Sequence, residues 1–352
     1  MDWRASSGRY RPGRDMRLVA FLALGAVGGF AFMLGVSDAP NATASLIAAR
    51  AASYPRAMAF SFTFHVIGGL LAGQAVALTM VTLVHLPATQ IAGAYLAGSL
   101  ATISFTLAAT RRGIPVSASI GLVGGLTGAA AVMGGLGAVG WGGLQGWRPY
   151  GVIGTLAAVV LSPVLGAVVA GALRSGLQPV ADRASRESLR PVRALIWISA
   201  ALVALADGSN DGQKAMGLAT GILVAGGAIS RFQVPFWVTA AVAITLAAGT
   251  AVGGRHIVRT VSTRFYRGGP LDGLAAQTAA AVTILGASAV GAPVSTSTIV
   301  AAGMVGVGSA RRRHHVHWPT VVRVVSAWLI TVPACAILGA VLASIGIAVG
   351  GR

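Results

Sequence analysis

Long apolar runs recur along this chain of 352 residues, and they restrict what it can fold into. Hydrophobic residues make up 55% of the sequence and charged residues only 10%, whereas soluble domains carry about 25% charged residues. A run of about 20 apolar residues is long enough to cross a bilayer as an α-helix. The sequence therefore predicts an all-α polytopic membrane protein. The apolar runs that support this prediction cover residues 18–36, 59–84, 150–173, 237–252 and 321–349.

The formal net charge is +18, and it comes mainly from arginines that lie in clusters between the apolar runs. This placement is typical of loops that stay on the cytoplasmic side of a membrane and meet anionic lipid. We therefore expect membrane lipid as a partner, no nucleic acid, and a location in the bacterial cytoplasmic (inner) membrane. The clusters lie at 4–17, 111–112, 174–193, 255–267 and 311–313.

A polar stretch, SGLQPVADRASRESLRP at 175–191, divides the chain into two apolar halves of nearly equal length. We expect a basic tail over 1–16 and a first transmembrane repeat over 17–175. A polar, arginine-rich linker is expected over 176–191, on the cytoplasmic side, and a second transmembrane repeat over 192–349.

Two motifs of the first half return in the second half, in the same order. GVSDAPNA begins at Gly35 and GSNDGQKA at Gly208, which is 173 positions later. GIPVSASIGLVGG begins at Gly113 and GAPVSTSTIVAAG at Gly291, which is 178 positions later. Two independent matches at nearly one offset indicate an internal duplication.

Duplicated halves with Gly- and Pro-interrupted apolar segments are typical of secondary transporters, which bind their substrate near the midplane where the repeats meet. We expect helix breaks at both pairs of motifs. The backbone groups freed there must face protein or a wet cavity, because lipid cannot satisfy them. The stretches 90–142 and 192–229 are each expected to form either crossing helices or re-entrant hairpins.

The Gly-x-Pro-Val-Ser-x-Ser motifs predict a break followed by a fresh helix start, because proline suits the first turn of a helix. Free N–H groups, hydroxyl donors and the positive end of the helix dipole would then converge, which suits an anion. The alternative is that the small hydroxyl residues only let helices pack closely. The hydroxyl residues concerned are Ser117, Ser119, Ser295, Thr296, Ser297 and Thr298.

The aspartate motifs place carboxylates at membrane depth, where a charge is retained for a partner or a function. Asp38 with Asn41, and Asn210 with Asp211, offer oxygen ligands that suit Na⁺ or a proton relay. The alternative is that each aspartate caps the helix that follows it.

Lys214 is the single lysine of the sequence. We expect it to act as a charge partner of Asp207 or Asp211 rather than to contact the anion. His65 lies inside an apolar run, and we expect it to hydrogen-bond to a neighbouring helix rather than to carry protons.

GSNDGQKAMG, GAPVSTST and their first-half counterparts resemble the inorganic phosphate transporter (PiT) family. The similarity continues through 254–260 and 273–277 and covers nearly the whole chain outside the basic tail. The resemblance implies inverted repeats, re-entrant hairpins and phosphate uptake coupled to Na⁺ or H⁺. It assigns phosphate contacts to Ser117, Ser119, Ser295, Thr296, Ser297 and Thr298, cation binding or coupling to Asp38, Asn41, Asn210 and Asp211, and supporting roles to Asp207, Lys214 and Gln277.

Four positions depart from the pattern of that family. Ser37 stands where Asn or His is frequent, Asp207 stands where His is common, and Ile120 and Thr298 stand where the hairpins often carry His. These departures leave the number and identity of the coupled cations open.

The expected function is a secondary active transporter that imports inorganic phosphate, alone or as a metal–phosphate complex, by symport with H⁺ or Na⁺ and alternating access. No cofactor and no metal other than Na⁺ is expected, and a homo-oligomer is compatible with the sequence. The alternatives are a sulfate or other oxyanion permease of the same fold, a channel, and an intramembrane enzyme acting on lipid phosphates. The enzyme would need a nucleophile or metal cluster, for which the apolar segments offer little beyond His65.

Overall fold

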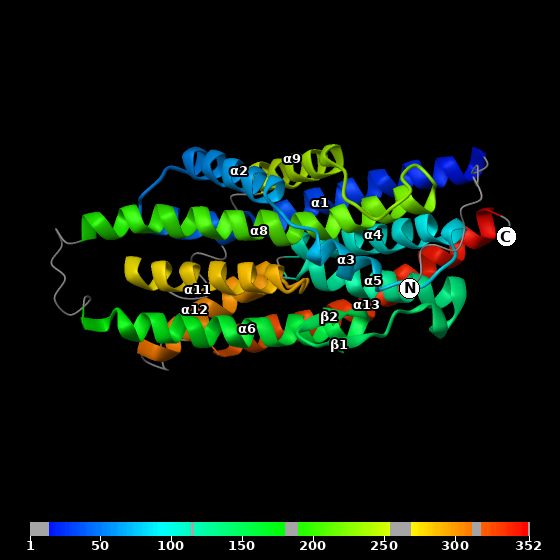
Figure 1. Ribbon diagram of the computed structural model, residues 1–352. Helices are drawn as coiled ribbons and strands as arrows, with labels where there is room; N and C mark the ends of the chain where they lie inside the picture. Colours follow the sequence, from blue (N-terminus) through cyan, green and yellow to red (C-terminus); the bar gives the residue numbers. More distant parts are fainter. Residues whose placement is uncertain are drawn as a thin grey trace.

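The computed structural model describes residues 14–112, 114, 116–179, 189–253, 269–311 and 318–350 as a helical bundle (Figure 1). The basic tail up to residue 13, most of the linker between the halves, Gly113, Pro115 and the stretch 254–260 lie outside the described residues. The elements of the first half are α1 (Arg14–Ala48), α2 (Tyr54–Leu70), α3 (Ala75–Val81), α4 (Ala88–Arg111), α5 (Ala118–Gly134), η1 (Leu136–Ala138), β1 (Gly143–Gln145), β2 (Arg148–Tyr150) and α6 (Gly151–Gly176). Those of the second half are α8 (Leu189–Ala225), α9 (Phe236–Val252), α11 (Pro270–Ala289), α12 (Thr296–Arg311) and α13 (Trp318–Gly350).

Five helices in the described part of the chain are long and apolar enough to cross a membrane. They are α1, α4, α6, α8 and α13, and the bent pair α2–α3 makes six if it counts as one span. The protein is therefore a multi-pass, all-α membrane protein, as the apolar runs predicted.

The apolar run 59–84 is not one helix, contrary to the simplest prediction. It divides into α2 and α3, which meet at an angle of 75° around residues 71–74. The bend exposes the first backbone N–H groups of α3, which have no partner within the helix. The side chain of Gln213 on α8 accepts one of them, from Val76, at 3.0 Å.

The aspartate motifs do not break their helices, which corrects the prediction. Asp38 lies inside α1 and Asp211 inside α8, so neither residue caps a helix. The motif glycines serve close packing instead. A Cβ atom at Gly35 would lie 1.9 Å from the carbonyl oxygen of Leu246 on α9, and one at Gly208 would lie 2.3 Å from that of His65 on α2.

The Pro-Val-Ser motifs do interrupt the helices, as predicted. α4 and α11 end before them, α5 and α12 begin after them, and Gly291 has a φ of +77°. Pro293 lies three positions before the first residue of α12, so it does not begin that helix as expected. The α4–α5 hairpin lies in one half of the bundle's length and the α11–α12 hairpin in the other (Figure 1).

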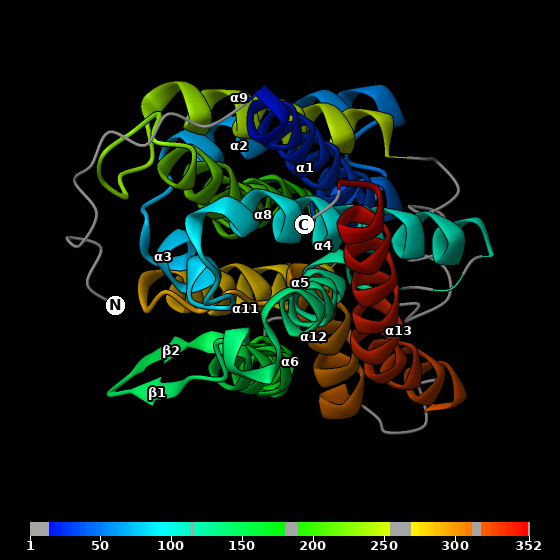
Figure 2. The same cartoon turned by 90° about the vertical axis from the view of Figure 1, so that its right-hand side faces the viewer.

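Contacts between the two halves occur in pairs in which the halves exchange roles. α5 packs against α13 as α12 packs against α6, and α1 packs against α9 as α8 packs against α2. Each hairpin therefore packs against a helix from the other half of the chain. The short antiparallel strands β1 and β2 extend from the bundle beside the start of α6 (Figure 2).

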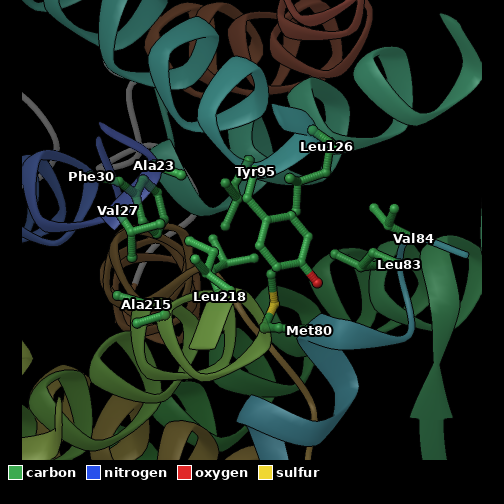
Figure 3. Packing of buried hydrophobic residues seen from close by; sticks show 14 of the residues in the cluster. Ala23, Val27, Phe30, Met80, Leu83, Val84, Tyr95, Leu126, Ala215 and Leu218 are labelled. Carbon is green, nitrogen blue, oxygen red and sulfur yellow. The ribbon is translucent and has the colours of Figure 1, made fainter. Parts of the chain in front are cut away.

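The largest apolar core joins helices from both halves around Tyr95 of α4 (Figure 3). Phe30 of α1, Met80 of α3, Leu126 of α5 and Leu218 of α8 belong to the same buried cluster. Because interiors pack as densely as organic crystals, this cluster fixes the α4–α5 hairpin against α8. It thereby fixes the turn before α5 beside the polar centre of α8.

Candidate functional site

The turns of the two helical hairpins meet through a pair of serines. The hydroxyl groups of Ser117 and Ser295 lie 2.7 Å apart, and both residues are buried. Ser117 is the N-cap of α5, where its side chain accepts the N–H of Ile120 at 3.3 Å. Ser295 directly precedes α12, and its carbonyl oxygen accepts the Thr298 hydroxyl at 2.7 Å. Two helix N-termini thus face one place, with the positive ends of their dipoles converging there.

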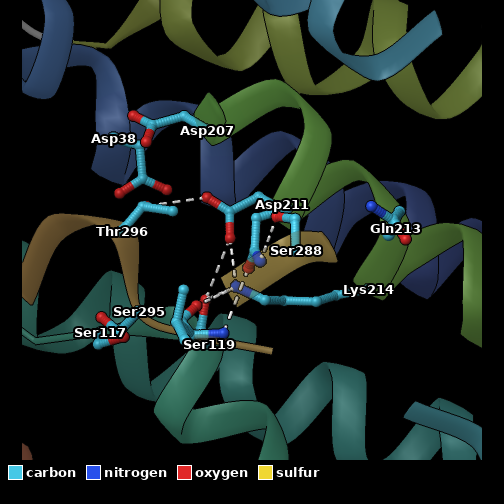
Figure 4. A network of polar contacts seen from close by, with 12 residues as sticks. Asp38, Ser117, Ser119, Asp207, Asp211, Gln213, Lys214, Ser288, Ser295 and Thr296 are labelled. Atoms are coloured by element: carbon cyan, nitrogen blue, oxygen red, sulfur yellow. Dashed lines mark hydrogen bonds and ion pairs between the residues drawn. The ribbon is translucent and has the colours of Figure 1, made fainter. Parts of the chain in front are cut away.

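A buried ion pair on α8 joins both hairpins (Figure 4). The Lys214 ammonium donates to the Asp211 carboxylate, to the Ser119 hydroxyl of α5 at 2.8 Å, and to the carbonyl oxygen of Val294 before α12. The second oxygen of Asp211 accepts the hydroxyl of Thr296 at 3.0 Å. The predicted charge partner of Lys214 is therefore Asp211 rather than Asp207.

The first aspartate motif lies beside this ion pair and reaches α8 through Asn41. The Asn41 amide donates to Asp38 at 3.2 Å and to Asp207 at 2.9 Å. Asp38 is close enough to Asp207 and Asp211 for their charges to interact (Figure 4). All three aspartates are buried. Asp207, for which the family resemblance implied a supporting role, thus links the first motif to the second.

His65 of α2 lies next to Asp207. Its Nε2 atom is 4.0 Å from a carboxylate oxygen of Asp207, and its Nδ1 atom is 2.8 Å from the carbonyl oxygen of Ser61 on its own helix. The Nε2 atom and the Asp207 Oδ1 atom are both buried, and neither has a hydrogen-bond partner within the described part of the chain. The bond to Ser61 lies within α2, whereas we expected one to a neighbouring helix.

Asn210 and Gln277 support the backbone around the site. The Asn210 amide donates to the Ser288 hydroxyl at 2.8 Å and to the carbonyl oxygen of Ala292 at 3.1 Å, and its oxygen accepts the Val294 N–H at 3.3 Å. Gln277 of α11 donates to the carbonyl oxygens of Asn41 and Ala42, each at 3.2 Å. Asn210, predicted to bind a cation, therefore holds the turn before α12.

Most of the predicted anion-binding hydroxyls gather at this junction, and one is set apart. Ser117, Ser119, Ser295, Thr296 and Thr298 are buried, whereas Ser297 is half-buried. Sequence reasoning missed Gln213, whose side chain accepts a backbone N–H at the start of α3, and Ser288, whose hydroxyl accepts the Asn210 amide. The polar run around Asp211 was the available signal for Gln213, and no comparable signal pointed to Ser288.

Apposed helical hairpins with a buried polar junction, set among membrane-crossing helices, define a multi-pass membrane protein of the transporter class. The chain belongs to the phosphate transporter family, whose family model matches residues 34–339. The resemblance seen in the motifs is thereby confirmed, and the chain is grouped with transporters rather than with enzymes.

Curated relatives match this chain over most of their length. A probable low-affinity inorganic phosphate transporter of Rhizobium meliloti is 33% identical over 313 residues, which cover 88% of this chain and 91% of that protein. A protein of the same description from Bacillus subtilis is 31% identical and covers 89% and 92% of the two chains. A solved structure described as the sodium-dependent phosphate transporter shares the fold with a TM-score of 0.78, at 20% identity and with 93% of this chain covered.

Proposed function

We propose that this protein imports inorganic phosphate across the bacterial cytoplasmic membrane by symport with Na⁺ or H⁺. The observation that carries the proposal is the junction of the α5 and α12 N-termini at Ser117 and Ser295, next to the buried Asp211–Lys214 pair. Helix N-termini and hydroxyl donors suit a tetrahedral oxyanion approached from two sides. The names of the curated relatives support phosphate as that anion.

The carboxylates favour phosphate over sulfate at the same place. Phosphate near neutral pH still carries a proton, so it can donate a hydrogen bond to a carboxylate, whereas sulfate has no proton to donate. Asp211 already accepts a hydroxyl of α12 and lies among the anion-binding groups. It would therefore accept the phosphate O–H and repel sulfate, and the anion contacts would fall to Ser117, Ser119, Ser295 and Thr296.

The charges of the site support coupling to a cation. Asp38, Asp207 and Asp211 face one ammonium, that of Lys214, so the cluster has two more negative than positive charges when all four are ionised. A bound anion adds to this excess inside the membrane, where an unpaired charge costs several kcal/mol. A cation held by Asp38 and Asn41, with Asp207 in support, would offset it, so the fully loaded carrier would cross more easily than a half-loaded one. Within the described residues, no group of three or more His, Cys, Asp or Glu is arranged to hold a metal ion, so backbone, amide or hydroxyl oxygens would have to complete a Na⁺ site.

The packing of the halves supports alternating access by two inverted repeats, 17–175 and 192–349. α5 of the first half packs against α13 of the second, and α12 of the second half packs against α6 of the first. Repeats that contact each other in this reciprocal way can rock against each other around a fixed site. The hairpin turns that bind the anion would lie at the centre of that motion.

Uptake of labelled phosphate into proteoliposomes tests the proposal, with Na⁺ or H⁺ gradients imposed separately. We expect accumulation driven by one of the two gradients, efflux when that gradient is reversed, and little competition from excess sulfate. Flux that ignores the cation gradient would indicate a channel and overturn symport. Full competition by sulfate would overturn the choice of phosphate.

The variant Asp211→Asn tests the site within the same assay. It removes the carboxylate that accepts Thr296 and pairs with Lys214. Breaking a buried ion pair leaves the partner charge uncompensated, so we expect coupled uptake to fall at least about tenfold. Asp15→Asn, at an exposed acid of α1, is the matched control and should leave uptake unchanged. Normal uptake by Asp211→Asn would remove the proposed role of this residue.

A further inference from the structure

Lys214 and Asn41 hold equivalent places in the two aspartate motifs. Each lies three positions after an aspartate, Asn41 after Asp38 and Lys214 after Asp211. Each side chain also donates to that aspartate in the folded chain. One motif therefore carries a neutral amide where the other carries its own positive charge.

The Lys214 ammonium is enclosed by oxygen atoms from three elements. It donates to a carboxylate of α8, to the Ser119 hydroxyl of α5 and to the free carbonyl oxygen of Val294 before α12. An ammonium has three hydrogens, so all of them are used. The side chain is 1% exposed. Carboxylate, hydroxyl and released backbone carbonyl are also the oxygen ligands that transporters offer to a small monovalent cation.

A lysine suits this ring of oxygen atoms better than an arginine would. Every other basic residue among the 26 Lys and Arg is an arginine. A guanidinium is a planar fork that spreads its charge, whereas an ammonium is a compact point charge that can replace a metal ion. The surroundings of the first motif show the opposite situation. Asn41 brings no charge, and the Oδ1 atom of the neighbouring Asp207 has no hydrogen-bond partner among the described residues.

We propose that the Lys214 ammonium is a tethered coupling cation, occupying an oxygen cage in the second half that would otherwise take a free monovalent cation. The Asp38–Asn41–Asp207 cluster then remains as the place for a mobile cation. The protein would move one mobile cation fewer per phosphate than it would with an uncharged residue at position 214. This inference rests on the proposed symport and specifies its stoichiometry.

Lys214→Asn recreates in the second motif the residue found in the first, and it tests the proposal by thermal unfolding of the purified full chain. Unfolding is compared in sodium chloride and in choline chloride at equal ionic strength. We expect Na⁺ to raise the unfolding temperature of Lys214→Asn by at least about 3 °C more than that of the wild type, with saturation, because a ligand that binds only the folded state stabilises it. Lys214→Met, which lacks both charge and oxygen ligand, should show a smaller Na⁺ effect.

Flux measurements give the second readout. In proteoliposomes, the membrane voltage that nulls net phosphate flux reports the charge moved with each phosphate. We expect Lys214→Asn to move one more positive charge per phosphate than the wild type in Na⁺. The reciprocal variant Asn41→Lys should lose its dependence on external cation, because both cages would then hold an ammonium.

The outcomes separate this inference from the proposed function. A purely structural ion pair predicts that Lys214→Asn is destabilised equally in Na⁺ and choline, and that result overturns the tethered cation. An Asn41→Lys variant that keeps the cation dependence of the wild type overturns it as well, even if Lys214→Asn does not fold. If the wild type fails to take up phosphate, the proposed symport fails, while the unfolding experiment still decides whether Na⁺ replaces the lysine.

Discussion

Ser117 and Ser295 contact each other through their hydroxyl groups, and the 178 positions between them equal the offset between the two Pro-Val-Ser motifs. Each serine is therefore in contact with its own counterpart in the other half. Such a contact is what a two-fold axis between the proposed inverted repeats would produce. A tetrahedral anion at this point would meet the same hydroxyl from both sides.

Replacing either serine by alanine should weaken phosphate binding. Ser117→Ala and Ser295→Ala each remove one hydroxyl that faces the proposed anion. A hydrogen bond to a charged group is worth about 1.5–3 kcal/mol, so we expect the KM for phosphate to rise about 10- to 100-fold in proteoliposome uptake. Ser344→Ala, at an exposed serine of α13, is the control and should behave as wild type. A KM unchanged in both site variants would place the anion elsewhere.

Asp207 should set the cation requirement of uptake. Asp207→Asn keeps an oxygen that can accept the Asn41 amide but removes one negative charge beside Asp38. We expect the cation concentration for half-maximal uptake to rise at least about tenfold, because a hydrogen bond or contact to a full charge is roughly twice as strong as to a neutral group. The measurement is phosphate uptake against external Na⁺ or H⁺ concentration, with Asp15→Asn as the exposed control. If Asp207→Asn shows the same dependence of phosphate uptake on cation concentration as the wild type, Asp207 is not part of the cation site.

A side chain at Gly208 should lower the stability of the protein, although this residue lies within an unbroken helix. In Gly208→Ala the new Cβ would lie 2.3 Å from the carbonyl oxygen of His65, so α2 and α8 would have to separate. Overpacking of this kind costs about 1–3 kcal/mol, and we expect a lower unfolding temperature in detergent. Gly28→Ala on α1, whose Cβ would meet nothing within 4 Å, should be neutral or slightly stabilising. Equal stability of the two variants would show that the motif glycine is not needed for packing.

A second buried ion pair should matter for stability. Arg174 near the end of α6 pairs with Asp272 in the first turn of α11 at 2.5 Å, and both side chains are buried. Arg174→Met removes the guanidinium from this buried pair, and breaking a buried pair costs about 3–5 kcal/mol. Thermal unfolding of the purified protein should show this loss. Arg148→Met, at an exposed position of β2, should change little.

The sequence predicted the class of fold, and it supplied candidates for an anion site, for physical reasons. Apolar runs of bilayer length have few other uses, and a proline two positions after a glycine favours a helix break. These signals are local, so they appear in the sequence without knowledge of the partners. The hydroxyls of the Pro-Val-Ser turns became candidates for this reason, and five of the six are buried at the junction of the hairpins.

The aspartate motifs were misread because glycine has two uses. A glycine can end a helix, or it can let two helix backbones approach, and the choice depends on the neighbouring helix. At Gly35 and Gly208 the neighbours are α9 and α2, which the sequence does not place. The Asn41–Asp207 bond was equally hidden, because it joins residues 166 positions apart.

Because α8 is one continuous helix, a small rotation near its buried polar residues would move its distant end. Its 37 residues make a rod of about 55 Å, whereas the hydrocarbon core of a bilayer is about 30 Å thick. Asn210 lies 21 residues from the start of the helix at Leu189, a lever arm of about 31 Å. A tilt of about 10° around the buried polar cluster would therefore displace the Leu189 end by roughly 5 Å. In the proposed transport cycle, a small change at a few buried atoms would thus become a larger displacement at the Leu189 end of the helix.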